Sequence, residues 1–420
     1  MDPSIYRLRQ RDILALCVLA LLCLGTIMVQ SASMSVTGAV KWQWTPLGIK
    51  QFGFCFVALA TFLLVGRTDY ARFGRPTRVW WNHPAVWLLL FTCALNALVL
   101  VPGVGISKNG AQRWLPLGFT QLQPSELAKW SAVLFLAWWL TTRPLNTDRF
   151  FAGFLPTLAP IGVICLLIVI QDFGTAALIA IASLTMLLAG RIKLWHLLAV
   201  VPPVLGAAAW FVMHKTYRWK RMIAFTDPWA NPQREGYHMI QSLLSFSTGG
   251  VTGKGLGNGI QKLGYLPEDT TDFIFAVICE EIGLFGALLT VALYLGILYV
   301  AWQAVKRKSD DFGRMLAFGI GAMVGLQAAI NIAVATVSVP TKGLSLPLIS
   351  AGGSGLIITC AALGLLLSVT KFDHSQEEMS RPLERATDRE LGDEADAAPA
   401  ATPFDLIQPE PATVVDPTLA

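Results

Sequence analysis

The sequence predicts an all-α polytopic membrane protein with about ten transmembrane helices. The first observation is composition, because the 420-residue chain is 54% hydrophobic and only 14% charged, with a mean hydropathy of +0.55. Soluble domains rarely reach that balance. The second is that the apolar residues fall in blocks of about 20, the length at which a helix crosses a bilayer core. The third is the placement of basic residues between the blocks, which predicts an orientation.

Ten blocks have the composition of a membrane span. They cover residues 12–32, 48–66, 85–102, 123–142, 152–170, 173–190, 194–213, 273–303, 315–338 and 354–371. Only the short segment QDFG, residues 171–174, marks the boundary between the fifth and sixth blocks. Two spans joined by a tight turn and one broken helix are both compatible with that spacing.

Lysine and arginine are distributed unevenly between the loops. With the N-terminus placed in the cytoplasm, the inner loops contain Arg7, Arg9, Arg11, Arg67, Arg72, Arg75, Arg78, Arg143, Arg149, Arg191, Lys193, Lys306, Arg307, Lys308 and Arg314. The short outer loops contain only Lys41, Lys108, Arg113 and Lys342. Because cytoplasmic loops carry the excess of basic residues, this pattern predicts that both termini are cytoplasmic.

The predicted organisation is a cytoplasmic N-terminus (1–11), a membrane domain (12–371) and a tail (372–420). The tail is rich in Glu, Asp, Ala and Pro, which is typical of a disordered cytoplasmic extension. Within the membrane domain, residues 214–271 form a large outer loop between the seventh and eighth spans. A loop of that length is usually functional or disordered, and its aromatic and glycine content favours function. The seven cysteines all lie in apolar blocks without metal-ligand spacing.

Ionisable residues in or beside spans usually face a cavity or a partner. Glu126 and Lys129 are three residues apart and therefore share a helix face. They could form a self-neutralising ion pair, or Lys129 could pair with a carboxylate of another span. Asp172 precedes Gly174 and Thr175, and we expect it to cap the sixth helix as a structural polar residue.

The stretch YLPEDTTDFIFAVICEEIG, residues 265–283, places three carboxylates before an apolar run and two more, Glu280 and Glu281, within it. Asp272 could be the N-cap of the eighth helix, although the threonines before it could cap without a charge. It also stands at the outer membrane edge, where a carboxylate suits proton transfer. We therefore expect Asp272 to be functional and Glu280 and Glu281 to hold the bundle together by polar contacts.

Two polar residues, Gln327 and Asn331, lie four apart on one face of the ninth span. The segment PTKGLSLPLISAGGSG, residues 340–355, follows and is too rich in proline and glycine to be regular. At membrane depth, irregular backbone occurs only where protein covers it or a cavity runs beside it.

Several segments, in this order and spacing, resemble the signatures of the SEDS family (shape, elongation, division and sporulation). They are NGAQRWLPLG followed by QPSELAK, DPWANPQREGYH, GGVTGKGLGNGIQKLGYLPEDTTDFIFAVICEEIG and PTKGLSLPLISAGGSG. The resemblance covers residues 13–371. LGTIMVQSAS in the first span and PTKGLSLPLIS resemble the cell-division branch of the family more than its elongation branch.

The resemblance implies a ten-span peptidoglycan glycosyltransferase. It would polymerise lipid II, a disaccharide-pentapeptide on undecaprenyl pyrophosphate, at the outer face of the bacterial cytoplasmic membrane. The cell-division branch implies septal wall synthesis, a class B penicillin-binding protein as transpeptidase partner, and contacts with other divisome membrane proteins and membrane lipid. The family's essential aspartate matches Asp272, and its loop tryptophan matches Trp114. This sequence departs from the family at Gln171, Ala351 and Gly355, so we assign no side-chain role to the last two.

Such a transfer requires a base, cations beside the leaving pyrophosphate and a groove for the lipid tails. We expect Asp272 to be the base. Lys129, together with its neighbour Glu126, would hold Asp272 or meet the pyrophosphate. The further phosphate-binding candidates are Arg113, Arg218, Lys220 and Arg221. A divalent cation such as Mg²⁺ or Mn²⁺ could assist, although no acidic cluster with ligand spacing demands one. Nothing in the sequence indicates a nucleic-acid partner.

Two other classes of function fit parts of the sequence. A lipid II flippase needs polar residues at several depths on facing helices, whereas a polymerase needs them gathered at the outer edge. A non-catalytic scaffold for a transpeptidase would keep its function when Asp272 is replaced. The densest predicted cluster is at the outer edge, which favours the polymerase.

Overall fold

The computed structural model describes residues 9–34, 44–77, 79–108, 111–118, 120–142, 149–214, 216–234, 236–308, 310–341 and 343–372. They belong to one compact unit, Met1–Asp373. Most of the predicted N-terminal segment 1–11, and the predicted tail apart from residue 372, lie outside the described residues. The same holds for Lys41, Arg78, Arg143 and Lys342, on which part of the predicted orientation rests.

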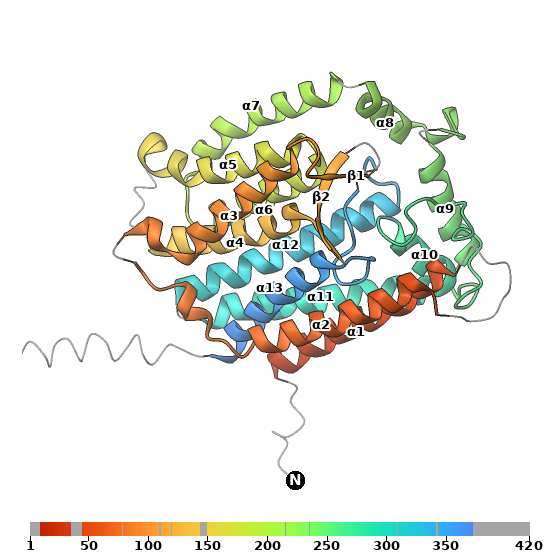
Figure 1. The fold of residues 1–420 in the computed structure, drawn as a ribbon, viewed down its shortest axis with the longest axis horizontal. Coiled ribbons are helices and arrows are strands. Elements are labelled where there is room, and N and C mark those ends of the chain that lie inside the picture. Colours follow the sequence, from red (N-terminus) through yellow and green to blue (C-terminus); the bar gives the residue numbers. More distant parts are fainter. Residues whose placement is uncertain are drawn as a thin grey trace, which may run out of the picture. The chain divides into compact units, whose positions relative to one another are not determined.

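Helices dominate the described part of the chain (Figure 1). The long helices are α1 (Gln10–Ser33), α2 (Pro46–Val65), α3 (Pro84–Val99), α4 (Pro124–Thr142), α5 (Leu155–Val169), α6 (Phe173–Ala189), α7 (Leu194–Met213), α11 (Leu284–Arg307), α12 (Asp311–Ala335) and α13 (Ser354–Lys371). The shorter ones are η2 (Tyr70–Phe73), η3 (Trp80–Asn82), η4 (Phe150–Phe154), α8 (Thr216–Thr226), η5 (Pro228–Ala230), α9 (Tyr237–Gly249) and α10 (Ile274–Glu281).

Nine of the ten predicted spans coincide with a long helix to within a few residues. Among the described residues, α1, α2, η4 with α5, α11, α12 and α13 are long and apolar enough to cross a membrane. The helices α3 and α6 and the first part of α7 are also apolar but shorter. Helices with the length and composition of membrane spans are therefore present, while the number that cross stays a prediction.

The eighth predicted span, 273–303, is wrong as a single helix. The chain forms α10, breaks, and starts again as α11. Gly283, at the break, has a φ of 74°, and a Cβ there would lie 2.4 Å from the backbone nitrogen of Gly253. Only glycine fits a left-handed backbone packed so closely against another loop. The sequence pattern missed the break because its cause is a contact with a distant segment.

The QDFG segment is resolved as a tight turn between two helices. α5 ends at Val169, α6 begins at Phe173, and the two helices pack against each other. Asp172 is the N-cap of α6, because its carboxylate accepts from the backbone N–H of Thr175. The predicted N-cap is therefore confirmed, and the alternative of one broken helix is excluded.

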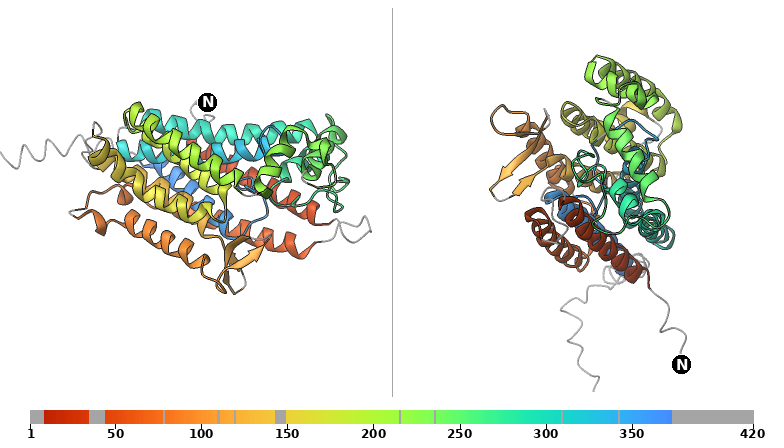
Figure 2. Two further views of the ribbon diagram at one scale, coloured as in Figure 1. Left: turned by 90° about the horizontal axis from the view of Figure 1, so that it is seen from above. Right: turned by 90° about the vertical axis from the view of Figure 1, so that its right-hand side faces the viewer.

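A small antiparallel sheet is the main departure from the all-α expectation. Its strands β1 (Ile106–Lys108), β2 (Ala111–Leu117) and β3 (Thr120–Leu122) stand in the order β1-β2-β3. They project from the helices between α3 and α4 (Figure 2). The predicted loop between the third and fourth spans thus contains a three-stranded sheet, whose β2 carries Arg113 and Trp114.

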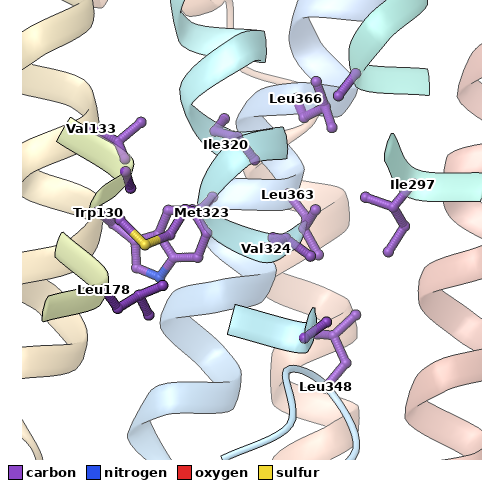
Figure 3. Packing of buried hydrophobic residues seen from close by; sticks show 14 of the residues in the cluster. Trp130, Val133, Leu178, Ile297, Ile320, Met323, Val324, Leu348, Leu363 and Leu366 are labelled. Carbon is purple, nitrogen blue, oxygen red and sulfur yellow. The ribbon is translucent and has the colours of Figure 1, made fainter. Parts of the chain in front are cut away.

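The core is built around α12, which packs against α4, α6, α11 and α13. Figure 3 shows Ile320, Met323 and Val324 of α12 between Trp130 of α4 and Leu363 of α13. These side chains are buried, so the helices interlock by packing of apolar surface. The same helix carries Gln327 and Asn331, which are therefore held by its packing against four other helices.

The loops form two groups, and hydrogen bonds connect loops of the same group. Among the predicted outer segments, Ala351 N donates to Thr270 O at 2.8 Å, and Arg113 Nε donates to Gln171 O at 2.9 Å. Among the predicted inner segments, the Tyr70 hydroxyl donates to Asp310 at 2.7 Å. This grouping agrees with the predicted alternation of the spans, although the direction in which each end faces stays a prediction.

Candidate active site

Asp272 lies just before α10 without capping it. The N-cap of α10 is Phe273, and no side chain makes a capping hydrogen bond there. The backbone N–H of Asp272 donates to Glu268 O at 3.1 Å, and its side chain is partly exposed. The N-cap position of α10 is therefore occupied by Phe273 and not by Asp272, which the sequence offered as the structural alternative.

Arg113 reaches toward the same region from β2. Its Nε donates to the carbonyl of Gln171 at 2.9 Å, and its Nη1 lies 3.6 Å from Asp172 Oδ2. The side chain of Gln171 completes the connection by accepting from the backbone N–H of Gln112 at 3.1 Å. The α5–α6 turn therefore fixes both the strand and the guanidinium that it carries.

Gly343 is the point where Arg113 and Asp272 meet. A Cβ built on Gly343 would lie 3.1 Å from Asp272 Oδ2 and 3.8 Å from Arg113 Nη1. A cation and a carboxylate from segments far apart in sequence thus face the same backbone position. This arrangement suits a reaction in which a proton is taken up on one side and negative charge develops on the other.

Two amides of α12 fix the backbone on both sides of this position. Asn331 Nδ2 donates to Asp272 O at 2.9 Å and to Leu344 O at 2.6 Å. Gln327 Nε2 donates to Ser345 O at 2.8 Å. A single buried amide therefore connects Asp272 to the segment that contains Gly343.

Lys129 is fully buried beneath this segment. Its Nζ lies 2.8 Å from Glu126 Oε2 and donates to Gln327 Oε1 at 2.7 Å. The predicted ion pair within α4 is confirmed. The alternative, a carboxylate of another span as the partner of Lys129, is wrong, because the partner that the structure gives it on another helix is the Gln327 amide.

Glu280 and Glu281 contact the glycine-rich loop, residues 250–264, which follows α9. Glu280 accepts from the backbone N–H of Ile260 at 2.9 Å and lies 3.3 Å from Lys254 Nζ. Glu281 lies 2.6 Å from the buried Lys262 Nζ and accepts from the hydroxyl of Ser31 at 2.7 Å. These contacts are of the kind expected for internal polar groups. They occur at the break after α10, next to the last turn of α1, rather than within a continuous span.

The remaining candidates lie elsewhere or are only partly described. Trp114 is partly buried on β2, where it pairs with Ile106 of β1. Lys220 is exposed on α8, which packs against α7 and η5. The side chains of Arg218 and Arg221 lie outside the described residues. No group of His, Cys, Asp and Glu suited to a metal ion occurs in the described part of the chain.

Comparison with known proteins decides the family. The family model FTSW_RODA_SPOVE, described as "Cell cycle protein", matches residues 11–375. The chain belongs to this family. The resemblance to SEDS proteins is thereby confirmed over the whole of the predicted membrane domain, 12–371.

Relatives within the FtsW/RodA/SpoVE family are similar along most of their length. The "Probable peptidoglycan glycosyltransferase FtsW" of Thioalkalivibrio sulfidiphilus is 42% identical over 385 residues, covering 90% of this chain and 93% of the relative. The protein of the same description from Nitrosococcus halophilus is 41% identical over 360 residues, covering 83% and 89%. These relatives carry the name of the cell-division branch that the sequence motifs favoured.

Solved structures of the family share the fold. One belongs to work on "Structural coordination of polymerization and crosslinking by a peptidoglycan synthase complex", with a TM-score of 0.68, 29% identity and coverage of 85% of this chain and 96% of that one. The rod shape determining protein RodA of Thermus thermophilus matches with a TM-score of 0.60 and 29% identity, covering 85% and 95%.

Sequence reasoning missed some residues that build the site of this family member. Gly343 carries no signal by itself, since glycines are frequent in the segment around it. Ser350, whose hydroxyl donates to Thr271 O at 2.6 Å, looks like any other loop serine. Gln327 and Asn331 were the useful signal, because two amides four residues apart in an apolar helix must find polar partners.

Proposed function

We propose that the protein is a peptidoglycan glycosyltransferase that polymerises lipid II at the outer face of the bacterial cytoplasmic membrane for septal wall synthesis. The observation that carries the proposal is the meeting of Asp272 and Arg113 at Gly343, among the predicted outer loops. The names of the relatives from Thioalkalivibrio sulfidiphilus and Nitrosococcus halophilus support the activity.

Asp272 is proposed as the general base. Its carboxylate takes the proton of the acceptor sugar's 4-hydroxyl while that oxygen bonds to the anomeric carbon of the donor. The bond between the anomeric carbon and the pyrophosphate oxygen breaks, and its electron pair leaves with the lipid pyrophosphate. The proton ends on Asp272, from which it passes to solvent, because the side chain is partly exposed.

Arg113 is proposed as the cation beside the leaving pyrophosphate. Its side chain is one-third exposed, and Gln171 and Asp172 hold its Nε and Nη1. A guanidinium fixed in this way retains donors for phosphate oxygens. Lys129 differs, because its ammonium is fully buried between Glu126 and Gln327. We assign Lys129 and Glu126 a supporting role: they hold the Gln327 amide, which binds the backbone of the 343–345 segment. Mg²⁺ or Mn²⁺ is a candidate for assisting at the pyrophosphate.

The position of the charged groups favours a polymerase over a flippase. Arg113 lies on β2, Asp172 and Asp272 lie just before helices, and Glu126 and Lys129 lie in the first two turns of α4. Glu280 and Glu281, which were expected within a span, lie instead at the break before α11. These groups are therefore gathered near one end of the helices rather than distributed along facing spans.

The partner is proposed to be a class B penicillin-binding protein, with other divisome membrane proteins nearby and the division septum as the location. The similarity to a chain of a peptidoglycan synthase complex supports an assembly of this kind.

The test is lipid II polymerisation by purified protein, with and without the candidate transpeptidase. We expect Asp272→Asn and Asp272→Ala to lower turnover by about 10²–10⁴-fold, the usual contribution of a general base. Asp269→Asn, which removes a carboxylate three residues away, is the matched control and should retain activity. Normal polymerisation by the Asp272 variants would exclude the base. A wild type that makes no glycan with its partner would exclude the polymerase, and lipid II transport between leaflets would be measured next.

A further inference from the structure

Three consecutive carbonyl groups, the last of which belongs to Asp272, are each bound by a donor from the chain after residue 330. The hydrogen bonds are Ala351 N to Thr270 O at 2.8 Å, Ser350 Oγ to Thr271 O at 2.6 Å and Asn331 Nδ2 to Asp272 O at 2.9 Å. None of the three carbonyls lies in a helix or strand. The backbone that leads to the proposed base is therefore held by side chains and by a distant loop rather than by secondary structure.

The N–H groups of the same backbone are held as well. Glu268 O accepts from the backbone N–H groups of three later residues, Thr271 at 3.2 Å, Asp272 at 3.1 Å and Phe273 at 3.2 Å. Glu268 has a φ of 56°, in the left-handed region that residues other than glycine rarely adopt. Both peptide groups that flank the Asp272 Cα are thus fixed, and the carboxylate extends from a Cα with a defined position.

Ser350 is the donor in this set whose own position is fixed most closely. Its Oγ accepts from the backbone N–H of Leu346 at 2.7 Å, and its N–H donates to Leu346 O at 3.1 Å. In the same turn, the buried Tyr294 hydroxyl donates to Pro347 O. Because a serine hydroxyl has one hydrogen and Oγ accepts from Leu346, that hydrogen is directed to Thr271 O.

We propose that Ser350 is a positioning residue of the transferase: its hydroxyl holds the peptide group between Thr271 and Asp272 and thereby sets where the base lies. This inference rests on the proposed glycosyltransferase activity and adds a residue on which the rate of proton transfer depends. A general base must lie within hydrogen-bond reach of the proton that it removes. Ser350 is only 5% exposed, so it acts through Asp272 and not by contact with the sugar.

Ser368 offers a matched comparison at the other end of α13. Its Oγ accepts from the backbone N–H of Tyr70 at 3.0 Å and donates to Thr68 O at 2.6 Å. Ser368 is buried, as Ser350 is. The two hydroxyls therefore make the same pair of hydrogen bonds, one beside Asp272 and the other among the predicted inner loops.

The experiment compares Ser350→Ala with Ser368→Ala by lipid II polymerisation with the transpeptidase partner and by thermal unfolding in detergent. Both variants should unfold at a lower temperature than the wild type, because each leaves a buried N–H and a buried carbonyl without a partner. Ser350→Ala should lose about 10–100-fold in kcat, the effect of a small misplacement of a reacting group, while the KM for lipid II stays unchanged. Ser368→Ala should keep the wild-type kcat.

A second pair of variants isolates the hydroxyl. Ser350→Thr and Ser350→Val add the same bulk, but only threonine keeps a hydroxyl that can bind Thr271 O. We expect Ser350→Thr to polymerise close to the wild-type rate and Ser350→Val to lose as much kcat as Ser350→Ala. Equal rates in the threonine and valine variants would overturn the inference.

The remaining outcomes separate this inference from the proposed function. Equal losses of kcat in Ser350→Ala and Ser368→Ala, or a raised KM with unchanged kcat, would overturn the positioning role. So would failure of both Ser350→Ala and Ser350→Val to fold, since the hydroxyl would then serve folding. Wild-type kcat in Ser350→Ala, with an inactive Asp272→Asn, would overturn the inference and leave the glycosyltransferase standing. An inactive wild type would contradict the proposed function itself.

Discussion

Asp269 shows how strongly the environment differs among the carboxylates near the site. Burial raises its pKa from 3.8 to about 6, and the charge of Glu268 adds to the rise, while backbone hydrogen bonds and Lys262 oppose it. A raised pKa means that the folded protein binds this proton more tightly than the unfolded chain does. Ionising Asp269 therefore costs stability, and the cost develops as the pH rises from about 4 to about 6.

Asp269→Asn should consequently stabilise the protein at neutral pH, by at most about 3 kcal/mol. The amide resembles the protonated acid, so wild type and variant should have similar stability below pH 4, and the difference should reach its full size above pH 6. Thermal unfolding in detergent at a series of pH values measures this. A difference that is the same at all pH values would show that Asp269 is solvated in the folded protein.

At the same scale, the sequence could identify Asp272 but not its exact surroundings. The acid stands out because threonines beside it could have capped a helix without a charge. Its neighbours in space, Arg113 and Gly343, come from other segments, and no local pattern connects them. The two amides Gln327 and Asn331, four residues apart in an apolar helix, were the sequence signal that α12 makes polar contacts.

The element that depends most on buried charge is the glycine-rich loop before α10. Its backbone N–H groups at Gly257, Ile260 and Gln261 donate to the carboxylates of Glu280 and Glu281. Lys262, only 2% exposed, pairs with Glu281 and also donates to Ser31 of α1. The loop is therefore held to the end of α10 by ionic contacts away from water, where a lost partner is costly.

Glu281→Gln should lower the free energy of unfolding by about 3–5 kcal/mol, because it leaves the ammonium of Lys262 buried without its carboxylate. The double variant Glu281→Gln with Lys262→Met should be less destabilised than the sum of the two single variants. Asp311→Asn is the matched control, since its partner Arg314 and the carboxylate are both exposed, and it should cost about 1 kcal/mol or less. Additive single effects, measured by unfolding in detergent, would contradict a buried pair.

The helices could be predicted from the sequence because each apolar block carries local signals of where its helix begins. Pro46 and Pro84 stand at the starts of α2 and α3, and Asp172 and Asp310 cap α6 and α12. The break at Gly283 does not follow from local pattern, because its cause is the close approach of Gly253. The sheet was missed for a similar reason: Gln112 of β2 is held by Gln171, which belongs to a turn between two later helices.

The distribution of basic residues makes a prediction for the whole molecule, namely that α9 and the glycine-rich loop face the outside and that η2 faces the cytoplasm. In a variant without the seven native cysteines, Asn258→Cys should react with a membrane-impermeant maleimide in intact spheroplasts. Arg72→Cys should react only after permeabilisation. Both positions are exposed, so a lack of reaction reports sidedness rather than burial. The reverse pattern would invert the orientation and place Asp272 on the cytoplasmic side.

The groups that meet at Gly343 come from both halves of the chain, on β2, before α10 and after α12. While the protein is being synthesised and inserted, the first of these segments enters the membrane long before the last one leaves the ribosome. Arg113 is therefore inserted before Asp272 has been synthesised, and Asp272 is inserted before the backbone at Gly343 that faces it. The arrangement at Gly343 is therefore completed only when the segment after α12 has been inserted.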